Sequence, residues 1–462
     1  MERTLSSEPG FRPVNSLLSQ FAASRRLFRR SLASLRGAEP DAVTRGWLVV
    51  TGGSVGRLGL GFIASIIIAR ALGPEAFGIF SVLAAVASFA GAGVDLGLTN
   101  AAVRRVSAAW SDGSGRAGDI WQTFFWLRVL IVLGVAGAGI ALAGPISSMF
   151  LDVSGRELYL RLALLGVVAT VLSGSVTSML QATSRFGRLS AVLLVNSGLT
   201  VLLAVALAQA GHLTITTALL VLGIGTSLAS FALAYTLLPG VWSLRPPEVK
   251  LFMYHARDLS RYGVWLWIGS LLGILALHLD LLLVNHWVAP ATVGMYALAV
   301  TLANKAEVIN QSLYTVLLPT ASALRTHEEV SGYIRRSLIR SGGIGIGLLP
   351  AILLADPLIR LFYGDAYAAA SGIFQLLLVV AILNIVLTPL LMLAFTFDRP
   401  RVVALADGTR VVALLVAGVV LIPVLETDGA VLARLAAAVA GGVVIVAFVV
   451  RQVRSRDDAT VQ

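Results

Sequence analysis

The sequence predicts an all-α protein that crosses a membrane many times. Of its 462 residues, 57% are hydrophobic and only 13% are charged, and the mean hydropathy is +0.87. Soluble domains carry about 25% charged residues. The apolar residues gather in segments of about 20 or more, the length that a helix needs to cross a bilayer. Their number and spacing predict twelve transmembrane helices in two pseudo-symmetric bundles of six.

The first two helices are expected to be joined by a tight turn. Residues 46–69 contain one charge, Arg57, and as a helix they span roughly 36 Å. Gly73 and Pro74 then break the helix, and Pro74 is acceptable at the start of the next one. We expect the second helix to run to about residue 103 and to end before Arg104 and Arg105.

The other apolar segments follow the same pattern. In the first half they lie near residues 119–143, 158–180, 189–210 and 214–238, and in the second half near residues 262–284, 291–318, 336–355, 372–396, 402–424 and 429–450. This predicts a basic N-terminal tail at 1–45, a six-helix bundle at 46–238, a connector at 239–261, a second bundle at 262–450 and a tail at 451–462.

The two halves are expected to be repeats of one another. Pro74, Gly78 and Phe80 correspond to Pro290, Gly294 and Tyr296 at a constant offset of 216 residues. Because six is an even number of crossings, both halves enter the membrane from the same side. The pseudo-two-fold axis should therefore run along the membrane normal, with a cavity between the bundles.

The charges predict the orientation. Most of the 35 Lys and Arg residues fall in the two tails and in alternate loops, near residues 104, 185, 250, 325 and 399. Lys and Arg are enriched in cytoplasmic loops, so both termini, the connector and these loops are expected in the cytoplasm. The net charge of +11 is explained in this way, and no nucleic-acid partner is expected.

Several motifs resemble those of a known family. They are residues 69–74 (Ala-Arg-Ala-Leu-Gly-Pro), Phe77-Gly78, residues 95–98 (Asp-Leu-Gly-Leu), Asp280, residues 293–296 (Val-Gly-Met-Tyr) and residues 362–367 (Phe-Tyr-Gly-Asp-Ala-Tyr). In this order they resemble the Wzx-type polysaccharide flippases, which share a superfamily with the lipid II flippases and the MATE exporters. The resemblance covers roughly residues 46–450.

The resemblance implies a transport function in the bacterial inner membrane. The expected substrate is an oligosaccharide linked to a polyprenyl diphosphate of the undecaprenyl type, used for O-antigen or exopolysaccharide synthesis. Membrane lipids would surround the protein, and a polysaccharide polymerase or chain-length machinery would be possible partners. The expected mechanism is alternating access between the two bundles.

Charged residues inside the apolar segments are the candidate site residues, because an ionisable group near the bilayer centre costs about 2.5–3.5 kcal/mol by insertion scales. Arg57 lies about 16 Å into its helix. Its role is either to line a cavity, as the resemblance favours, or to pair with a carboxylate on a neighbouring helix. Arg128 is a second candidate for substrate binding.

A polar stripe is expected on the eighth helix. Thr301, Asn304, Glu307, Gln311 and Thr315 recur at offsets of three or four and are flanked by Lys305. Such a stripe lines either a hydrated cavity or a polar helix contact.

The stripe completes the set of expected site residues. Substrate binding is expected at Arg57, Arg128, Lys305, Asn304 and Gln311, and ion coupling at Glu307 and Asp280. Of the remaining charges, Asp407 and Arg410 are expected to neutralise each other, and Arg434 to extend toward the membrane surface.

The sequence also excludes several classes of protein. There is no cysteine, no GxxxxGK[ST] phosphate loop and no HExxH. We therefore expect no enzyme activity, no cofactor and no metal. The alternatives are a cation-coupled multidrug or small-molecule exporter of the MATE type, which favours acidic cavities, and a membrane scaffold without transport.

Overall fold

The computed structural model describes residues 42–113, 115–150, 157–238, 242–322, 324, 326–397, 399 and 401–460. Almost all of these residues are helical, and none lies in a strand. The fold class that we expect is confirmed. The basic tail at residues 1–45 lies almost entirely outside the described residues. The last helix continues through the expected C-terminal tail as far as Thr460.

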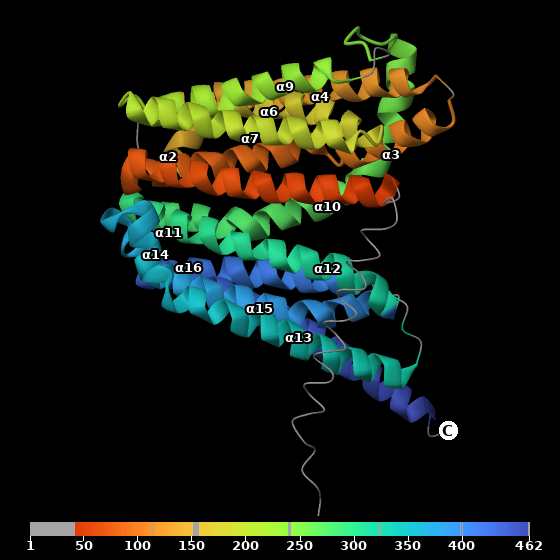
Figure 1. Ribbon diagram of the computed structural model, residues 1–462, viewed down its shortest axis with the longest axis vertical. Coiled ribbons are helices and arrows are strands. Elements are labelled where there is room, and N and C mark those ends of the chain that lie inside the picture. Colours follow the sequence, from red (N-terminus) through yellow and green to blue (C-terminus); the bar gives the residue numbers. More distant parts are fainter. Residues whose placement is uncertain are drawn as a thin grey trace, which may run out of the picture.

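The helices form two groups, which we call the N-lobe and the C-lobe (Figure 1). The N-lobe contains α2 (Ala42–Asp95), α3 (Leu98–Ser111), α4 (Ala117–Ala141), α5 (Ala143–Phe150), α6 (Glu157–Ala182), α7 (Phe186–Gln209), α8 (Ile215–Thr217), η1 (Ala218–Gly225) and α9 (Thr226–Thr236). The C-lobe contains α10 (Val249–Trp287), α11 (Pro290–Ala303), η2 (Asn304–Ala306), α12 (Glu307–Ser322), α13 (His327–Leu353), α14 (Ala355–Tyr363), η3 (Asp365–Tyr367), α15 (Ala370–Thr396) and α16 (Arg401–Thr460).

The protein is a multi-pass membrane protein. Among the described residues, seven helices are long and apolar enough to cross a membrane, or eight if α13 and α14 form one bent span. Two of the seven are pairs merged across a break, at Gly73 in α2 and at Glu426 in α16. These helices, with α10 and the α11–α12 pair, cover all the expected spans and are compatible with twelve crossings.

Some helix boundaries differ from those expected. The second helix ends at Asp95 instead of continuing to residue 103, because Leu96 and Gly97 have positive φ angles of 45° and 70°. A separate helix, α3, then carries Arg104 and Arg105. The eighth helix is also interrupted, by a short 3₁₀ turn at η2 that includes Lys305. Finally, α10 begins at Val249, within the expected connector.

The two ends of the molecule differ. α3 and the C-terminal end of the chain lie at one end, which we call the arginine-rich end, and α14 lies at the opposite end, which we call the far end (Figure 1). At the arginine-rich end the connector packs on the N-lobe. Arg105 Nη2 donates to Asp258 Oδ1 at 2.7 Å, and Trp242 stacks on Trp110.

The lobes meet in a reciprocal contact near the far end, between the start of the second half of α2 and the start of α11. A Cβ added to Gly78 would overlap the carbonyl oxygen of Pro290 and lie 2.7 Å from Gly294 N, and a Cβ added to Gly294 would overlap the carbonyl oxygen of Pro74. Gly78 thus contacts Pro290 in the same way that Gly294 contacts Pro74, and the two pairs are related by the offset of 216. Such exchange is the property of an interface on a two-fold axis.

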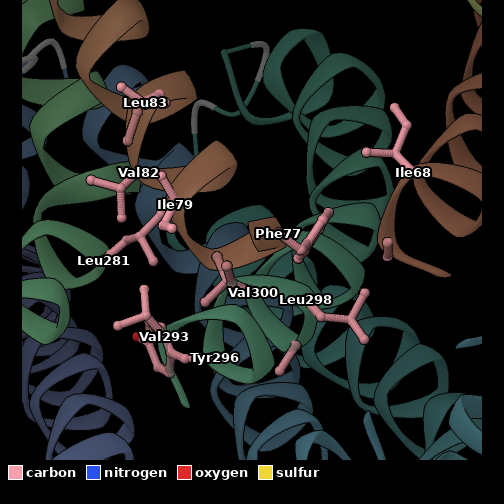
Figure 2. Close-up of a cluster of buried hydrophobic side chains, with 14 of the residues drawn as sticks. Ile68, Phe77, Ile79, Val82, Leu83, Leu281, Val293, Tyr296, Leu298 and Val300 are labelled. Atoms are coloured by element: carbon pink, nitrogen blue, oxygen red, sulfur yellow. The ribbon is translucent and has the colours of Figure 1, made fainter. Parts of the chain in front are cut away.

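An apolar core forms around this contact. Figure 2 shows Ile79 and Val82 of α2 close to Leu281 of α10 and Val293 of α11. These residues are buried within one large cluster that includes members of both lobes. Deeper in the membrane, the indole of Trp267 on α10 donates to the carbonyl of Ala92 on α2 at 2.9 Å. The lobes are thus held together by α2, α10 and α11.

Candidate functional site

The motif at residues 69–74 contacts the motif at residues 362–367 across the far end. The Tyr367 hydroxyl donates to the carbonyl of Ala69 at 2.8 Å, and Arg70 Nη2 donates to the carbonyl of Leu361 at 2.7 Å. The hydroxyls of Tyr363 and Ser65 lie 3.1 Å apart. Two stretches that are about 300 residues apart in the sequence therefore close the far end together. We call these three contacts the far-end latch.

A lateral pocket of about 560 Å³ lies between the lobes, beside this latch. Leu58, Gly59 and Phe62 form the wall on α2, and Phe362 and Phe374 contribute aromatic rings from α14 and α15. The remaining lining residues are Leu302, Lys305, Val308, Ile309, Leu358, Ile359 and Tyr363. The pocket is therefore apolar and aromatic, with one charged residue, Lys305, among those that line it.

Arg57 lies close to this charged residue. It is exposed on α2, directly before the wall residue Leu58, and the positive charges of Arg57 and Lys305 repel each other. The first half of α2 packs on α7, where Gly53 meets Ser190 and Gly56 meets Leu194. α12 packs on α15 instead. Two cations from different lobes thus lie near one apolar pocket.

The polar stripe that we expect on one helix is divided by η2. Lys305 lines the lateral pocket, whereas Asn304 lines a different cavity inside the C-lobe. The side chains of Glu307 and Gln311 lie outside the described part of the structure, although both residues belong to α12. These two adjacent residues therefore face different cavities, as residues i and i+1 of a helix do.

The interior cavity, which we call the C-lobe chamber, contains several polar side chains among apolar ones. It consists of a space of about 350 Å³ that includes Asn304 and Arg434 and an adjoining space of about 200 Å³ that includes Tyr314. Both spaces are lined by Asn310, Asn384 and Arg410. The Thr388 hydroxyl donates to Asn310 Oδ1 at 2.9 Å.

Asp280 is part of a buried ion pair at one end of this chamber. The residue is 0% exposed, Arg434 Nη2 donates to its Oδ1 at 3.0 Å, and both Arg434 Nε and the Tyr296 hydroxyl donate to its Oδ2. Arg434 therefore does not extend to the membrane surface, as the sequence suggested. It lies on the second part of α16 and neutralises a carboxylate on α10.

The other charged pairs have different environments. Arg410 Nη1 lies 3.3 Å from Asp407 Oδ1, so these two residues do form the expected pair within one helix. Arg128 is buried in the N-lobe, 3.4 Å from Asp95 and over the ring of Phe124. Asp95 also accepts from Thr99. The aspartate of the motif at 95–98 thus has a partner on α4, and Arg128 lies apart from the lateral pocket.

The predicted site residues are therefore not brought together in a single cavity. Arg57 and Lys305 lie together, Asn304 and Asp280 belong to the C-lobe, and Arg128 belongs to the N-lobe interior. Within the described residues, no cluster of three or more His, Cys, Asp or Glu side chains is arranged to hold a metal.

The partnership of Arg434 with Asp280 was missed from the sequence, although a signal was present. Asp280 lies seven residues before the end of α10, and Arg434 lies eight residues after the break at Glu426. At 1.5 Å per residue, both lie roughly 10–12 Å from the far end. Opposite charges at equal depth on different helices are candidates for a pair.

Solved structures of several membrane transporters have a similar fold. A multidrug resistance MATE family transporter of the MOP superfamily, in an inward-facing conformation, superposes with a TM-score of 0.66 at 15% identity, over 87% of this chain and 99% of that chain. The lipid II flippase MurJ, in an inward closed conformation, gives a TM-score of 0.64 at 13% identity, over 87% of each chain. The MATE transporter VcmN of Vibrio cholerae gives 0.59 at 15% identity, over 90% and 96%.

These identities are low, so the superpositions establish the fold alone. No curated protein matches the sequence. Residues 67–372, however, match the family described as polysaccharide biosynthesis protein. This match begins in the first half of α2, covers both glycines of the reciprocal contact and both motifs of the far-end latch, and ends in α15. The chain belongs to the polysaccharide biosynthesis protein family.

Proposed function

We propose that the protein flips a polyprenyl-diphosphate-linked oligosaccharide across the bacterial inner membrane. The observation that carries this proposal is the combination of two cations, Arg57 and Lys305, with an apolar lateral pocket. The substrate is an amphiphile with an anionic headgroup and a hydrocarbon tail. A site for it needs both chemistries side by side, and this part of the molecule supplies them from both lobes.

The chemistry of each group suits this substrate. The guanidinium of Arg57 is able to hold a phosphate through two parallel hydrogen bonds, and the ammonium of Lys305 acts as a point charge. The first isoprenoid units would contact Phe62, Phe362 and Phe374 in the pocket. The rest of the tail would remain in the bilayer while the sugars pass between the lobes.

The far-end latch and the reciprocal glycine contact would form the periplasmic gate. With both termini in the cytoplasm, as the positive-inside rule indicates, the far end faces the periplasm. Release of the substrate there requires the two lobes to separate at Gly78 and Gly294. Rocking of one lobe against the other around a central site is the usual form of alternating access in proteins built from repeats.

The alternative is a cation-coupled exporter of small molecules, which has the same fold. A positively charged organic substrate would be repelled by Arg57 and Lys305, and the C-lobe carboxylates Asp280 and Asp407 are already paired with arginines. The charges therefore favour an anionic substrate.

Substitution of the two cations tests the proposed site. We expect Lys305→Ala and Arg57→Ala each to lower flipping about tenfold or more in vesicles, because a hydrogen bond to a charged group contributes roughly 1.5–3 kcal/mol. Arg57→Lys should keep part of the activity. Arg161→Ala is the control, since Arg161 is exposed and pairs with Glu157 on its own helix. Normal flipping by both alanine variants, or export of a cationic dye that depends on neither residue, would refute the proposal.

The source of energy is a second testable part of the proposal. Outward movement of two negative charges along the membrane potential gains about 2.3 kcal/mol per charge per 100 mV, or roughly 5 kcal/mol at 100 mV. If Glu307, or Asp280 as second candidate, also carries a proton, the pH gradient becomes a second source of energy for flipping. We expect Glu307→Gln to lose the dependence on the pH gradient but to keep the dependence on potential. Vesicles in which the two gradients are set separately provide the measurement, and equal flipping without either gradient would contradict the scheme.

A further inference from the structure

A second apolar depression lies on the C-lobe, apart from the lateral pocket, and it shares the lining residue Leu387 with the smaller space of the chamber. It is a groove of about 570 Å³ between α15 and the last part of α16. One wall is formed by Leu383 and Leu387, and the other by a face of α16 that begins at Val439. Among the described residues that line the groove, Arg451 is the only charged one. We call it the α15–α16 groove.

The groove exists because small residues on α16 meet larger ones on α15. Gly442 is buried, and Leu387 occupies the place where its side chain would be, since Leu387 Cδ1 lies 2.8 Å from a Cβ added there. One turn further along α16, the small side chain of Ala447 leaves the groove unfilled. Val439, Val443 and Val446 are 48%, 61% and 41% exposed along the rim, so the groove opens toward the surrounding lipid.

The depth of the groove corresponds to one leaflet. The break at Glu426 marks the far end of the second part of α16, and Val439 lies 13 residues beyond it, which is about 20 Å. Arg451 lies a further 12 residues along, about 18 Å. The 25 residues from Glu426 to Arg451 span about 38 Å, which places these two residues at opposite headgroup levels of a hydrocarbon core about 30 Å thick. The groove therefore runs from near the middle of the core to the headgroup level at the arginine-rich end. The contact of Phe397 with Phe448, at 5.9 Å between ring centres, places the end of α15 there as well.

We propose that this groove binds an anionic phospholipid of the cytoplasmic leaflet. One acyl chain would lie along the valines, and the phosphate would pair with the guanidinium of Arg451. The length of about 18 Å matches a chain that crosses one leaflet, which is half of about 30 Å. The single charge lies where a headgroup would be and has the sign that an anionic lipid requires.

The preference for anionic lipid can be measured on the whole protein in detergent. Native mass spectrometry would compare retention of phosphatidylglycerol with that of phosphatidylethanolamine carrying identical chains. We expect preferential retention of phosphatidylglycerol and a loss of about fivefold in Arg451→Gln, the size expected for one arginine near an anionic lipid. Arg335→Gln, at an exposed arginine of α13 near the same end, should retain the preference.

Filling the groove tests the position of the acyl chain. Ala447→Trp should displace phosphatidylglycerol, whereas Ala404→Trp, at an exposed alanine in the first part of α16, should not. Glycerol phosphate, which has no chain, should not compete. The proposal is overturned if the two lipids are retained equally, if Arg335→Gln has the same effect as Arg451→Gln, or if Ala447→Trp has none. It is also overturned if undecaprenyl phosphate is preferred, or if Ala447→Trp dissociates a dimer, which would show a second copy in the groove.

Discussion

Replacement of Gly294 by alanine is expected to abolish flipping while the protein still inserts into the membrane. The added Cβ would overlap the carbonyl oxygen of Pro74 and lie 3.1 Å from Gly78 N. Both obstacles are backbone atoms, which cannot rotate away as a side chain can. The start of α11 must therefore move away from α2, and the closed state of the far end is lost.

The absence of cysteine from the sequence makes this displacement measurable. A single cysteine at position 65, in place of the serine that contacts Tyr363, would report access from the far end. We expect faster labelling in the Gly294→Ala background than in the parent. Gly93→Ala is the matched control, because Gly93 is also on α2 and an added Cβ there meets nothing within 4 Å. Unchanged labelling together with normal flipping would show that the reciprocal contact is not part of the gate.

Arg434→Ala should cause the largest loss of stability, about 3–5 kcal/mol in the free energy of unfolding. The substitution leaves the carboxylate of Asp280 without its ionic partner at a position with no exposure. Only the hydroxyl of Tyr296 would remain as a donor among the side-chain groups described around it. Thermal unfolding of the purified protein in detergent would measure the effect as a lower Tm.

Two further variants distinguish the stability lost through an unpaired charge from the stability lost through missing side-chain packing. In Asp280→Asn/Arg434→Ala no charge is left unpaired, so part of the lost stability should return. Arg161→Ala should change stability by less than about 1 kcal/mol, because exposed ion pairs contribute little. If the double variant is no more stable than Arg434→Ala, the pair does not act through its charges.

The buried pair also bears on ion coupling. If Asp280 binds and releases a proton, it must do so in competition with Arg434, whose guanidinium has two hydrogen bonds to the carboxylate. Glu307 remains the first candidate for that reason. A double variant that is stable and flips normally under a pH gradient would remove Asp280 from the coupling scheme.

Much of the architecture follows from the sequence alone. Apolar segments of membrane-spanning length must become helices, because a backbone in hydrocarbon has to satisfy its own hydrogen bonds. The offset of 216 between Gly78 and Gly294 revealed the repeat, and the structure confirms it as a reciprocal contact on the pseudo-two-fold axis. The family motifs were also recognisable, since they are short and local.

The site was harder to predict, because a charge inside an apolar segment indicates a need for a partner without identifying it. Only the packing of α10 against α16 brings Arg434 to Asp280, and only the packing of α2 against α4 brings Arg128 to Asp95. Only the surrounding helices decide that Asn304 lines the C-lobe chamber and Lys305 the lateral pocket. The sequence by itself thus determined the helices, their repeat and the presence of costly charges in the membrane. The tertiary structure decided which charges neutralise one another and which two lie together at the pocket, because residues hundreds of positions apart meet only when the lobes pack.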